Sequence, residues 1–210
     1  MKMKLIIFGC GGHARSVANA IISNGDALDI LFADNNAKPD EIIMGFPVIY
    51  DYDLSGDWKY IIAVGDNNKR REIYDDLQNK KKGKCISVVS QIAYIGEETE
   101  IGVGTFIAPY AYVGPQAEIG VNTIINTGSI IEHEAAIGNH THIAPRATIC
   151  GRSKIGNNVF CGAGSTIIDN ISICDDVIVG AGAVVLEDIT EKGTYAGIPA
   201  RRVKRIPILK

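Results

Sequence analysis

The stretch that decides the fold reads Ile119-Gly120-Val121-Asn122-Thr123-Ile124-Ile125-Asn126-Thr127-Gly128-Ser129-Ile130-Ile131. An aliphatic residue recurs here every six positions, and this period continues without a slip from Ile95 to Val185, with Ile or Val at fifteen of its sixteen positions. Such a period is typical of a parallel β-helix, in which three six-residue segments make one triangular coil of about 18 residues. We therefore expect an all-β parallel β-helix over residues 91–192. Its aliphatic side chains should point inward, and the frequent glycine after each of them should let the chain turn a corner.

Residues 1–90 follow a different pattern, in which short apolar runs alternate with helical spacing. The expected strands are Lys4–Cys10, Leu28–Asp34, Tyr60–Gly65 and Cys85–Ser90, and the expected helices are His13–Ser23 and Asn67–Lys81. Strands that alternate with helices predict a small α/β, Rossmann-like half domain with a parallel sheet. Repeat structures need covered ends, so we expect this domain to cap one end of the β-helix and residues 193–210 to cap the other.

Composition and charge narrow the functional classes. The chain carries 21 Lys and Arg against 24 Asp and Glu, a net charge of −3, which argues against nucleic-acid and membrane-surface partners. No apolar run is long enough to cross a bilayer, and the five cysteines form no CxxC pair. We expect a cytoplasmic protein without a structural metal. A three-sided coil with small residues on flat sides suits a homotrimer.

His133 is the leading candidate for chemistry in the repeat region. It lies two positions after the inward Ile131, so its side chain should reach the surface. The equivalent position of the next coil is Gly151, which should leave a slot beside the imidazole and offer an N–H to an oxyanion. The same step stacks Ala163 and Ala181 on one face as a smooth groove. Histidine suits a general base near neutral pH.

Glu134 is the expected partner of His133, because a carboxylate fixes the tautomer of the ring and raises its basicity. Successive residues of a strand point to opposite faces, so this pairing requires a corner at 133–134. Two other interpretations remain open. The histidines at 133, 140 and 142 are solvated turn residues, or they supply three ligands to a metal ion at a subunit boundary.

The N-terminal domain carries the turn Gly9-Cys10-Gly11-Gly12-His13-Ala14, with Asp34 twenty residues after Ala14. This satisfies the G-x-G-x-x-G/A pattern of dinucleotide-binding turns. Glycines admit close backbone approach, and the helix N-terminus favours an anion, with His13 as a further phosphate contact. The ligand is then a nucleotide diphosphate or NAD; the alternative is a tight turn in a purely structural domain.

Together these features resemble the hexapeptide-repeat, left-handed parallel β-helix acyltransferases. More narrowly, the chain is similar to bacterial sugar acetyltransferases related to sialic-acid O-acetyltransferase and to UDP-4-amino-sugar N-acetyltransferase. The resemblance covers nearly the whole chain. It rests on the glycine turn with His13, Asp34-Asn35, Ala63-Val64-Gly65-Asp66-Asn67, residues 126–134, His142 and Gly197-Ile198-Pro199-Ala200-Arg201.

The resemblance implies acetyl transfer from acetyl-CoA to the 4-amino group of a UDP-linked sugar, in a homotrimer with the site between neighbouring β-helices. It implies that the nucleotide sugar is bound by Gly11, Gly12, His13, Asp34, Asn35, Gly65 and Asn126. His133 is then the base and Glu134 raises its basicity. The donor is bound by His142, Gly151, Ala163 and Ala181. The alternatives are O-acetylation of a sialic-acid-like sugar, a metal-dependent β-helix enzyme, and a nucleotide-sugar-binding protein without catalysis.

Overall fold

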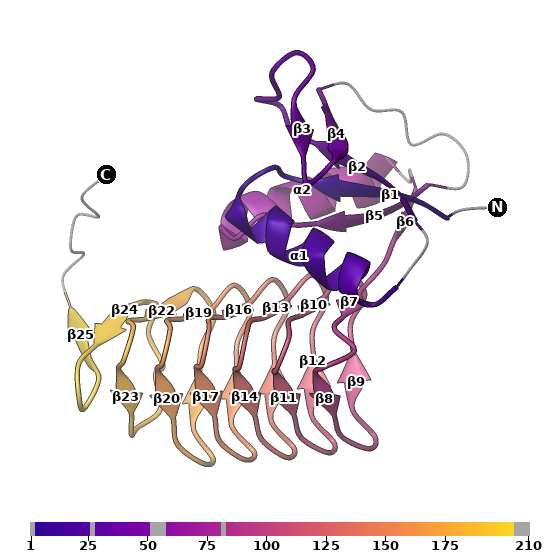
Figure 1. The fold of residues 1–210 in the computed structure, drawn as a ribbon. Helices are drawn as coiled ribbons and strands as arrows, with labels where there is room; N and C mark the ends of the chain where they lie inside the picture. The colour runs from indigo at the N-terminus through magenta and orange to yellow at the C-terminus, as the bar shows by residue number, and fades with distance from the viewer. Residues whose placement is uncertain (1–2, 26–27, 51–57, 81–82, 204–210) are drawn as a thin grey trace.

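The computed structural model describes residues 3–25, 28–50, 58–80 and 83–203, which form an α/β domain and a parallel β-helix (Figure 1). The domain has a six-stranded sheet in the order β3-β4-β2-β1-β5-β6. Its strands are β1 (Met3–Phe8), β2 (Leu28–Ala33), β3 (Ile42–Ile43), β4 (Phe46–Ile49), β5 (Lys59–Ile62) and β6 (Lys84–Cys85). All neighbours pair in parallel except β3 and β4.

The two helices cover opposite faces of this sheet. α1 (Gly12–Ser23) packs with Leu5 and Ile7 of β1, whereas α2 (Asn67–Lys80) packs through Leu77 against Ile6 and Phe8. The predicted half domain is therefore confirmed, but the strand expected at Cys85–Ser90 is divided: Cys85 ends β6 of this sheet, whereas Val88–Val89 is a strand of the β-helix. The other predicted elements lie within a few residues of the observed ones. The β3–β4 hairpin is an addition that the sequence pattern does not predict.

The β-helix has three faces, which we number in chain order. Face 1 consists of β7 (Val88–Val89), β10 (Phe106–Ile107), β13 (Ile124–Ile125), β16 (His142–Ile143), β19 (Phe160–Cys161) and β22 (Val177–Val179). Face 2 consists of β8 (Tyr94–Ile95), β11 (Tyr112–Val113), β14 (Ile130–Ile131), β17 (Thr148–Ile149), β20 (Thr166–Ile167) and β23 (Val184–Val185). Face 3 consists of β9 (Glu100–Ile101), β12 (Glu118–Ile119), β15 (Ala136–Ile137), β18 (Lys154–Ile155) and β21 (Ser172–Ile173).

Each strand pairs with the equivalent strand of the next coil, for example Ile107 with Ile125 and Ile131 with Ile149. The repeated aliphatic side chains fill the interior, and Cys161 takes one of their positions at 0% exposure. The predicted period, coil length and inward residues are therefore confirmed. Because Val88–Val89 already pairs with Phe106–Ile107, face 1 begins within the last three residues of the range assigned to the first domain.

The glycines of the repeat have a different role from the predicted one. The residue that turns each corner stands three positions after the aliphatic one and has a left-handed backbone, as at Glu134 with φ +58°. The glycine directly after the aliphatic residue instead allows stacked coils to approach closely. A Cβ on Gly114, for example, would lie 2.7 Å from the backbone N of His133. The prediction that these glycines turn the corners is wrong.

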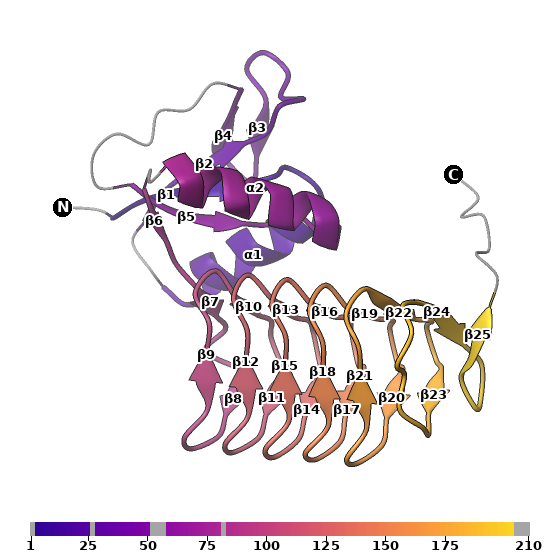
Figure 2. The same ribbon diagram turned by 180° about the vertical axis from the view of Figure 1, so that it is seen from behind.

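The α/β domain lies along face 1 rather than at an end of the β-helix, so the prediction of an N-terminal cap is also wrong (Figures 1 and 2). Outward side chains of face 1, Val88, Phe106 and Ile124, are buried with α1 residues such as Val17. Each such side chain contributes roughly 1.5–3 kcal/mol when removed from water. The α/β domain thus docks on face 1 of the β-helix, where the outward residues Val88, Phe106 and Ile124 are apolar.

After β23, the last strand of face 2, the chain forms two further strands that pack on the β-helix. β24 (Gly193–Ala196) extends face 1 beside β22, and β25 (Arg201–Val203) pairs with β24 in antiparallel fashion. Ala200 is 8% exposed and belongs to the interior cluster of the β-helix. The part of the predicted C-terminal cap at 204–210 lies outside the described residues. In the described ranges, neither helix has the length and apolarity that a bilayer crossing requires.

Candidate active site

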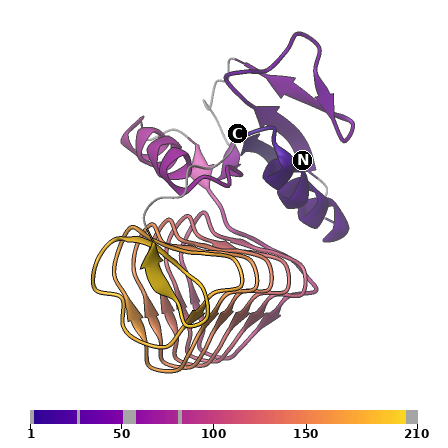
Figure 3. The same cartoon turned by 90° about the vertical axis from the view of Figure 1, so that its left-hand side faces the viewer.

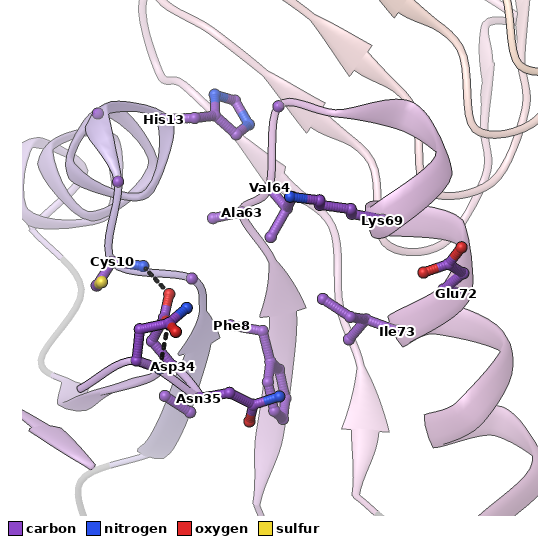
Figure 4. Close-up of a pocket in the computed structure, with 16 residues that line it drawn as sticks. Phe8, Cys10, His13, Asp34, Asn35, Ala63, Val64, Lys69, Glu72 and Ile73 are labelled. Atoms are coloured by element: carbon purple, nitrogen blue, oxygen red, sulfur yellow. Dashed lines mark hydrogen bonds between the residues drawn. The ribbon is translucent and has the colours of Figure 1, made fainter. Parts of the chain in front are cut away.

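A cavity of about 680 Å³ opens at the carboxyl ends of β1, β2 and β5 (Figure 4). β1 lies inside the sheet, with β2 on one side and β5 on the other. Open parallel sheets bind ligands at such a point, where the strand order reverses. The structure places six of the predicted substrate residues together in its wall: Gly11, Gly12, His13, Asp34, Asn35 and Gly65.

The glycine turn shapes the mouth of this cavity. Gly9 has φ +106°, and a Cβ atom there would lie 3.0 Å from the carbonyl O of Ala63, so the turn requires glycine. Gly11 is the N-cap of α1, and it gives the first helical turn no side-chain hydrogen bond. Gly11 and Gly12 have open space where a Cβ would stand. The first-turn N–H groups therefore stand at the cavity, an arrangement that favours phosphate.

Asp34 fastens the glycine turn to the loop after β2. Its carboxylate accepts hydrogen bonds from the backbone N–H groups of Cys10 (3.2 Å) and Asn36 (2.9 Å) (Figure 4). Burial alone would raise the pKa of Asp34, but these hydrogen bonds hold it below its usual value. An ionised carboxylate thus fixes this end of the cavity, next to Asn35.

α2 supplies the opposite wall with residues that were not predicted, Lys69, Glu72 and Ile73 (Figure 4). Their spacing of three and four puts them on one side of a helix, so a signal was present in the sequence. The amphipathic pattern of this helix predicts only that Ile73 is buried. The structure shows that the side chain of Ile73 also lines the cavity.

His142 lies on face 1 of the β-helix, beneath the cavity. Its Nδ1 donates to the carbonyl O of Gly65 (3.2 Å), and its Nε2 accepts from Nδ2 of Asn126 (3.1 Å). Its ring centroid is 6.2 Å from that of His13, whose Nε2 is buried without a hydrogen-bond partner. Residues from both parts of the chain therefore meet here.

These two buried histidines predict a pH dependence of stability. Burial lowers the pKa of His142 to about 4 and that of His13 to about 3, from an ordinary value of 6.5. The unfolded chain then binds protons at a pH where the folded chain does not. Stability is full above about pH 6.5 and is lost as the pH falls toward 4.

We expect each of these histidines to lower the free energy of unfolding by roughly 2 kcal/mol between pH 7 and pH 5. Urea unfolding of wild type and His142→Gln at both pH values measures this change. The variant should show the smaller difference between the two pH values. Equal differences in both proteins would contradict a neutral, buried His142.

His133 and Glu134 stand at a corner between face 2 and face 3, which meets the condition for their pairing. Nδ1 of His133 lies 3.0 Å from Oε2 of Glu134, and Nη1 of Arg152 lies 3.5 Å from the same oxygen. The hydrogen bond with His133 and the nearby Arg152 lower the pKa of Glu134, which keeps it ionised. Both side chains are more than 40% exposed, 42% for His133 and 47% for Glu134.

Gly151 occupies the same corner one coil further on, as the spacing of the repeat predicts. A Cβ on Gly151 would lie 2.6 Å from Nε2 of His133 and 3.3 Å from Oδ1 of Asp169. The ring therefore leans over the glycine, into space that any other residue would fill. Within the described ranges no hydrogen bond uses the N–H of Gly151.

The hydrogen bonds of the three clustered histidines separate their roles. The Glu134 carboxylate accepts from Nδ1 of His133, so Nε2 of this ring, which lies against buried Gly151, keeps a lone pair without a hydrogen-bond partner among the described residues. The corresponding lone pair of His142 is taken by Asn126. Nδ1 of His140 faces Nδ2 of Asn122 at 3.0 Å. His133 is therefore the ring best placed to accept a proton from a ligand.

Within one chain, the same three histidines do not come together as a metal site. His133 is at the corner between faces 2 and 3, His140 at the corner between faces 3 and 1, and His142 on face 1. No group of three metal-binding side chains occurs within the part of the chain that the structure describes. The alternative of a metal ion held by these histidines at a subunit boundary therefore needs ligands from more than one chain.

Ala163 and Ala181 do stack one coil apart, and the N–H of Gly182 donates to the carbonyl O of Ala163 (2.9 Å). They lie at the corner between faces 1 and 2, however, and not on a flat face as predicted. Both are exposed. Within one chain they are therefore apart from the corner that carries His133 and Gly151.

The cavity and His133 also lie on different sides of one chain. The α/β domain covers face 1, and the corner between faces 2 and 3 is the one opposite that face (Figure 3). A single chain thus presents two separate candidate sites. One is suited to an anionic ligand, and the other holds a poised imidazole.

Comparisons with known proteins match both parts of the chain. Residues 4–77 match the family described as PglD N-terminal domain, and residues 152–187 match bacterial transferase hexapeptide repeats. A structure of the acetyltransferase domain of PglB from Neisseria gonorrhoeae, in complex with acetyl coenzyme A, superposes with a TM-score of 0.90 at 27% identity. That alignment covers 97% of this chain and 100% of the other.

A variant of perosamine N-acetyltransferase from Caulobacter crescentus, in complex with CoA and GDP-perosamine, superposes with a TM-score of 0.87 at 26% identity. It covers 96% of this chain and 97% of the other. Protein L142 of Acanthamoeba polyphaga mimivirus is 32% identical over 103 residues, 48% of this chain. The chain spans only about a fifth of the length of that relative, 20%.

Proposed function

We propose that this chain, which is similar over nearly its whole length to PglD-like sugar acyltransferases, is an acetyl-CoA-dependent N-acetyltransferase of a nucleotide-linked amino sugar. The observation that carries the proposal is the corner at His133. There, Nε2 of a half-exposed imidazole, an ionised carboxylate on the other side of the ring and the backbone N–H of Gly151, which makes no hydrogen bond among the described residues, lie close together. This is the equipment for direct acyl transfer.

In the proposed step, the sugar amine attacks the carbonyl carbon of the acetyl thioester. Nε2 of His133 accepts a proton from the amine, and Glu134 stabilises the imidazolium that forms. The N–H of Gly151 donates to the oxyanion of the tetrahedral intermediate. The C–S bond then breaks, the CoA sulfur leaves and takes up the proton, and the amide is complete.

The cavity of the α/β domain supports a nucleotide sugar as the acceptor. Its glycine turn and helix N-terminus suit a diphosphate, with His13 nearby, and Asp34 and Asn35 form a polar end for the base. We propose a UDP-linked sugar with a 4-amino group. His142, Ala163 and Ala181 are proposed to contact the acetyl donor.

The separation of the two candidate sites supports assembly of the active site between copies of the chain, with each candidate site serving as a half-site. The outward residues of face 2 are mostly apolar: Tyr94, Tyr112, Ile130, Thr148, Thr166 and Val184. Those of face 3 are polar or small: Glu100, Glu118, Ala136, Lys154 and Ser172. The rings of Tyr94 and Tyr112 stack with their centroids 5.1 Å apart, and Tyr94 is 57% exposed. Face 2 is therefore the surface better suited to burial.

In a homotrimer with face 2 toward its axis, the His133 corner of one copy would lie next to the cavity of a neighbouring copy. The corner between faces 2 and 3 of one copy then meets the corner between faces 1 and 2 of the next. His133 and Gly151 would lie against Ala163, Ala181 and the cavity of the neighbouring copy. We propose this trimer as the active form.

Release of CoA thiol from acetyl-CoA tests the function, with three acceptors run in parallel: UDP-linked and GDP-linked 4-amino-4,6-dideoxy sugars, and free sialic acid. We expect release with the UDP-linked amino sugar, and a mass increase of one acetyl group in the product. Release with the GDP-linked sugar alone would correct the nucleotide. Release with sialic acid alone would make the enzyme an O-acetyltransferase.

A second candidate, a nucleotide-sugar-binding protein without catalysis, would bind the sugar and leave acetyl-CoA unchanged. The paired His133 and Glu134 argue against it, because binding alone has no use for a positioned base.

A further inference from the structure

Arg70 of α2 is the largest side chain that the described residues bury almost completely, at 1% exposure. All of its nitrogen atoms donate hydrogen bonds. The acceptors are the carbonyl O atoms of Asn122 (3.0 Å), Val64 (3.0 Å), Gly65 (3.4 Å), His140 (2.7 Å) and Thr141 (3.3 Å), and Oδ1 of Asn67 (2.8 Å). The five N–H groups of the guanidinium fork thus donate to six acceptors. A lysine, which has a single nitrogen, cannot make the same set of hydrogen bonds.

None of these six acceptors is a carboxylate. Burial lowers the pKa of Arg70 to about 10, with nearby Asp66 acting against the shift, so the guanidinium stays charged at neutral pH. Taking a charge out of water costs several kcal/mol, which satisfied donors only offset, and well-packed apolar residues of similar volume are often equally stable or more stable in such a place. A role beyond packing explains the choice of arginine.

The acceptors belong to two separate parts of the molecule. Asn122, His140 and Thr141 lie at and beside the corner between faces 3 and 1 of the β-helix, whereas Val64, Gly65 and Asn67 follow β5. Val64 and Gly65 line the cavity. One guanidinium therefore joins the cavity wall to the β-helix.

The carbonyl O of Gly65 is also the acceptor of Nδ1 of His142. Arg70 and His142 thus share one carbonyl group, which stands in the cavity wall. A shift of the loop at 64–67 would move this carbonyl, and the tautomer and tilt of the His142 ring would follow it.

We propose that Arg70 is a positioning residue, which sets the cavity wall and the His142 ring relative to the β-helix so that sugar and acetyl donor meet in one geometry. The inference rests on the proposed function. A displacement of about 1 Å between reacting groups can cost roughly 10²-fold in rate. The effect of losing Arg70 should therefore appear in kcat.

The test compares Arg70→Lys, which keeps the charge but not the fork, with Arg71→Lys on the next, exposed residue of α2. Steady-state kinetics with the amino sugar should show kcat lowered by roughly 10- to 100-fold in Arg70→Lys. The KM for acetyl-CoA should stay within about twofold, because His142 is the only proposed donor contact that Arg70 positions, and Ala163 and Ala181 are unaffected. Arg71→Lys should match wild type. An Arg70→Lys variant whose folded fraction has wild-type kcat would overturn the proposal.

If Arg70→Lys does not fold, Asn67→Ala is the second test. It leaves the arginine but removes one of its acceptors, together with the hydrogen bond from Nδ2 of Asn67 to the carbonyl O of Val159 in the β-helix (3.0 Å). It should lower kcat by roughly 3- to 10-fold, and unchanged kcat would count against positioning. If wild type shows no turnover, the proposed function fails, and the clamp that Arg70 forms between the cavity wall and the β-helix is then measured by hydrogen exchange. The amides at positions 69 and 70, which donate to Asp66, should exchange at least about tenfold faster in the tested variant than in wild type, with those of β14 and β17 unchanged. Equal exchange at these two amides would overturn the clamp.

Discussion

His133→Ala is expected to lower kcat by roughly 10²- to 10⁴-fold, the largest effect among the changes considered, with little effect on folding. The side chain is 42% exposed and contributes no interior contact to the β-helix, so its loss removes a proton acceptor and no packing. CoA release at saturating substrate measures kcat, and thermal unfolding measures stability. Gln116→Ala, at the same corner one coil away, is the matched control and should keep full activity. A His133→Ala enzyme within threefold of wild type would rule out its role as base.

The same variant also tests the assembly. Mixed with Gly11→Asp, which places a negative charge at the phosphate end of the cavity, His133→Ala should regain activity in hybrid trimers. Each chain then carries one intact half-site, and a site between copies finds one of each. If every site lay within one chain, no mixture would exceed the activity of the separate variants.

Gly151→Ala is expected to lower kcat by roughly 10²- to 10³-fold without unfolding the β-helix. The new methyl group would lie 2.6 Å from Nε2 and 2.7 Å from Cε1 of His133, so the ring must swing away and lose its place over the backbone N–H. The φ of Gly151 lies outside the left-handed region, so alanine fits the backbone itself. Stability should therefore fall little, by less than about 1 kcal/mol.

Kinetics and thermal unfolding of Gly151→Ala separate these two effects. Glu97→Ala is the control, because Glu97 lies in the same corner column two coils before His133 and is exposed. It should match wild type in both measurements. An active Gly151→Ala enzyme would show that the slot beside the ring is not used.

The fold was predictable because every inward position of the β-helix obeys one local rule. Ile107, Ile131 and Ile149 are all fully buried, and nothing in the tertiary structure alters that pattern. The pairing of His133 with Gly151 follows from the same arithmetic, since residues that stack in space are one coil apart in the chain. Where the contacts repeat with a fixed period, the spacing of residues in the sequence is sufficient to predict which of them touch.

The cavity and its contacts with His142 depend on how the α/β domain docks on the β-helix. The six-residue period of the sequence carries no information about that docking. Arg70 stands among charged residues of α2, and only the docked β-helix corner turns it into a buried fork. Asn126 was assigned to the substrate by resemblance, and the structure shows it holding His142. The docking face itself does have a signal in the sequence. Val88, Phe106 and Ile124 are apolar residues at outward positions, and each stands one coil after the last.

The unbroken register of the β-helix restricts how its length can vary. Removal of one hexapeptide would leave every aliphatic residue inside, and the chain would still fold into a prism. Each later residue would nevertheless advance by one face, so Ala181 would leave the corner that it shares with Ala163. Only the loss or gain of three hexapeptides together, one whole coil, keeps the angular position of everything downstream. A β-helix of this kind can therefore gain or lose whole coils without moving its later residues to another face, whereas a change of one or two hexapeptides moves all of them.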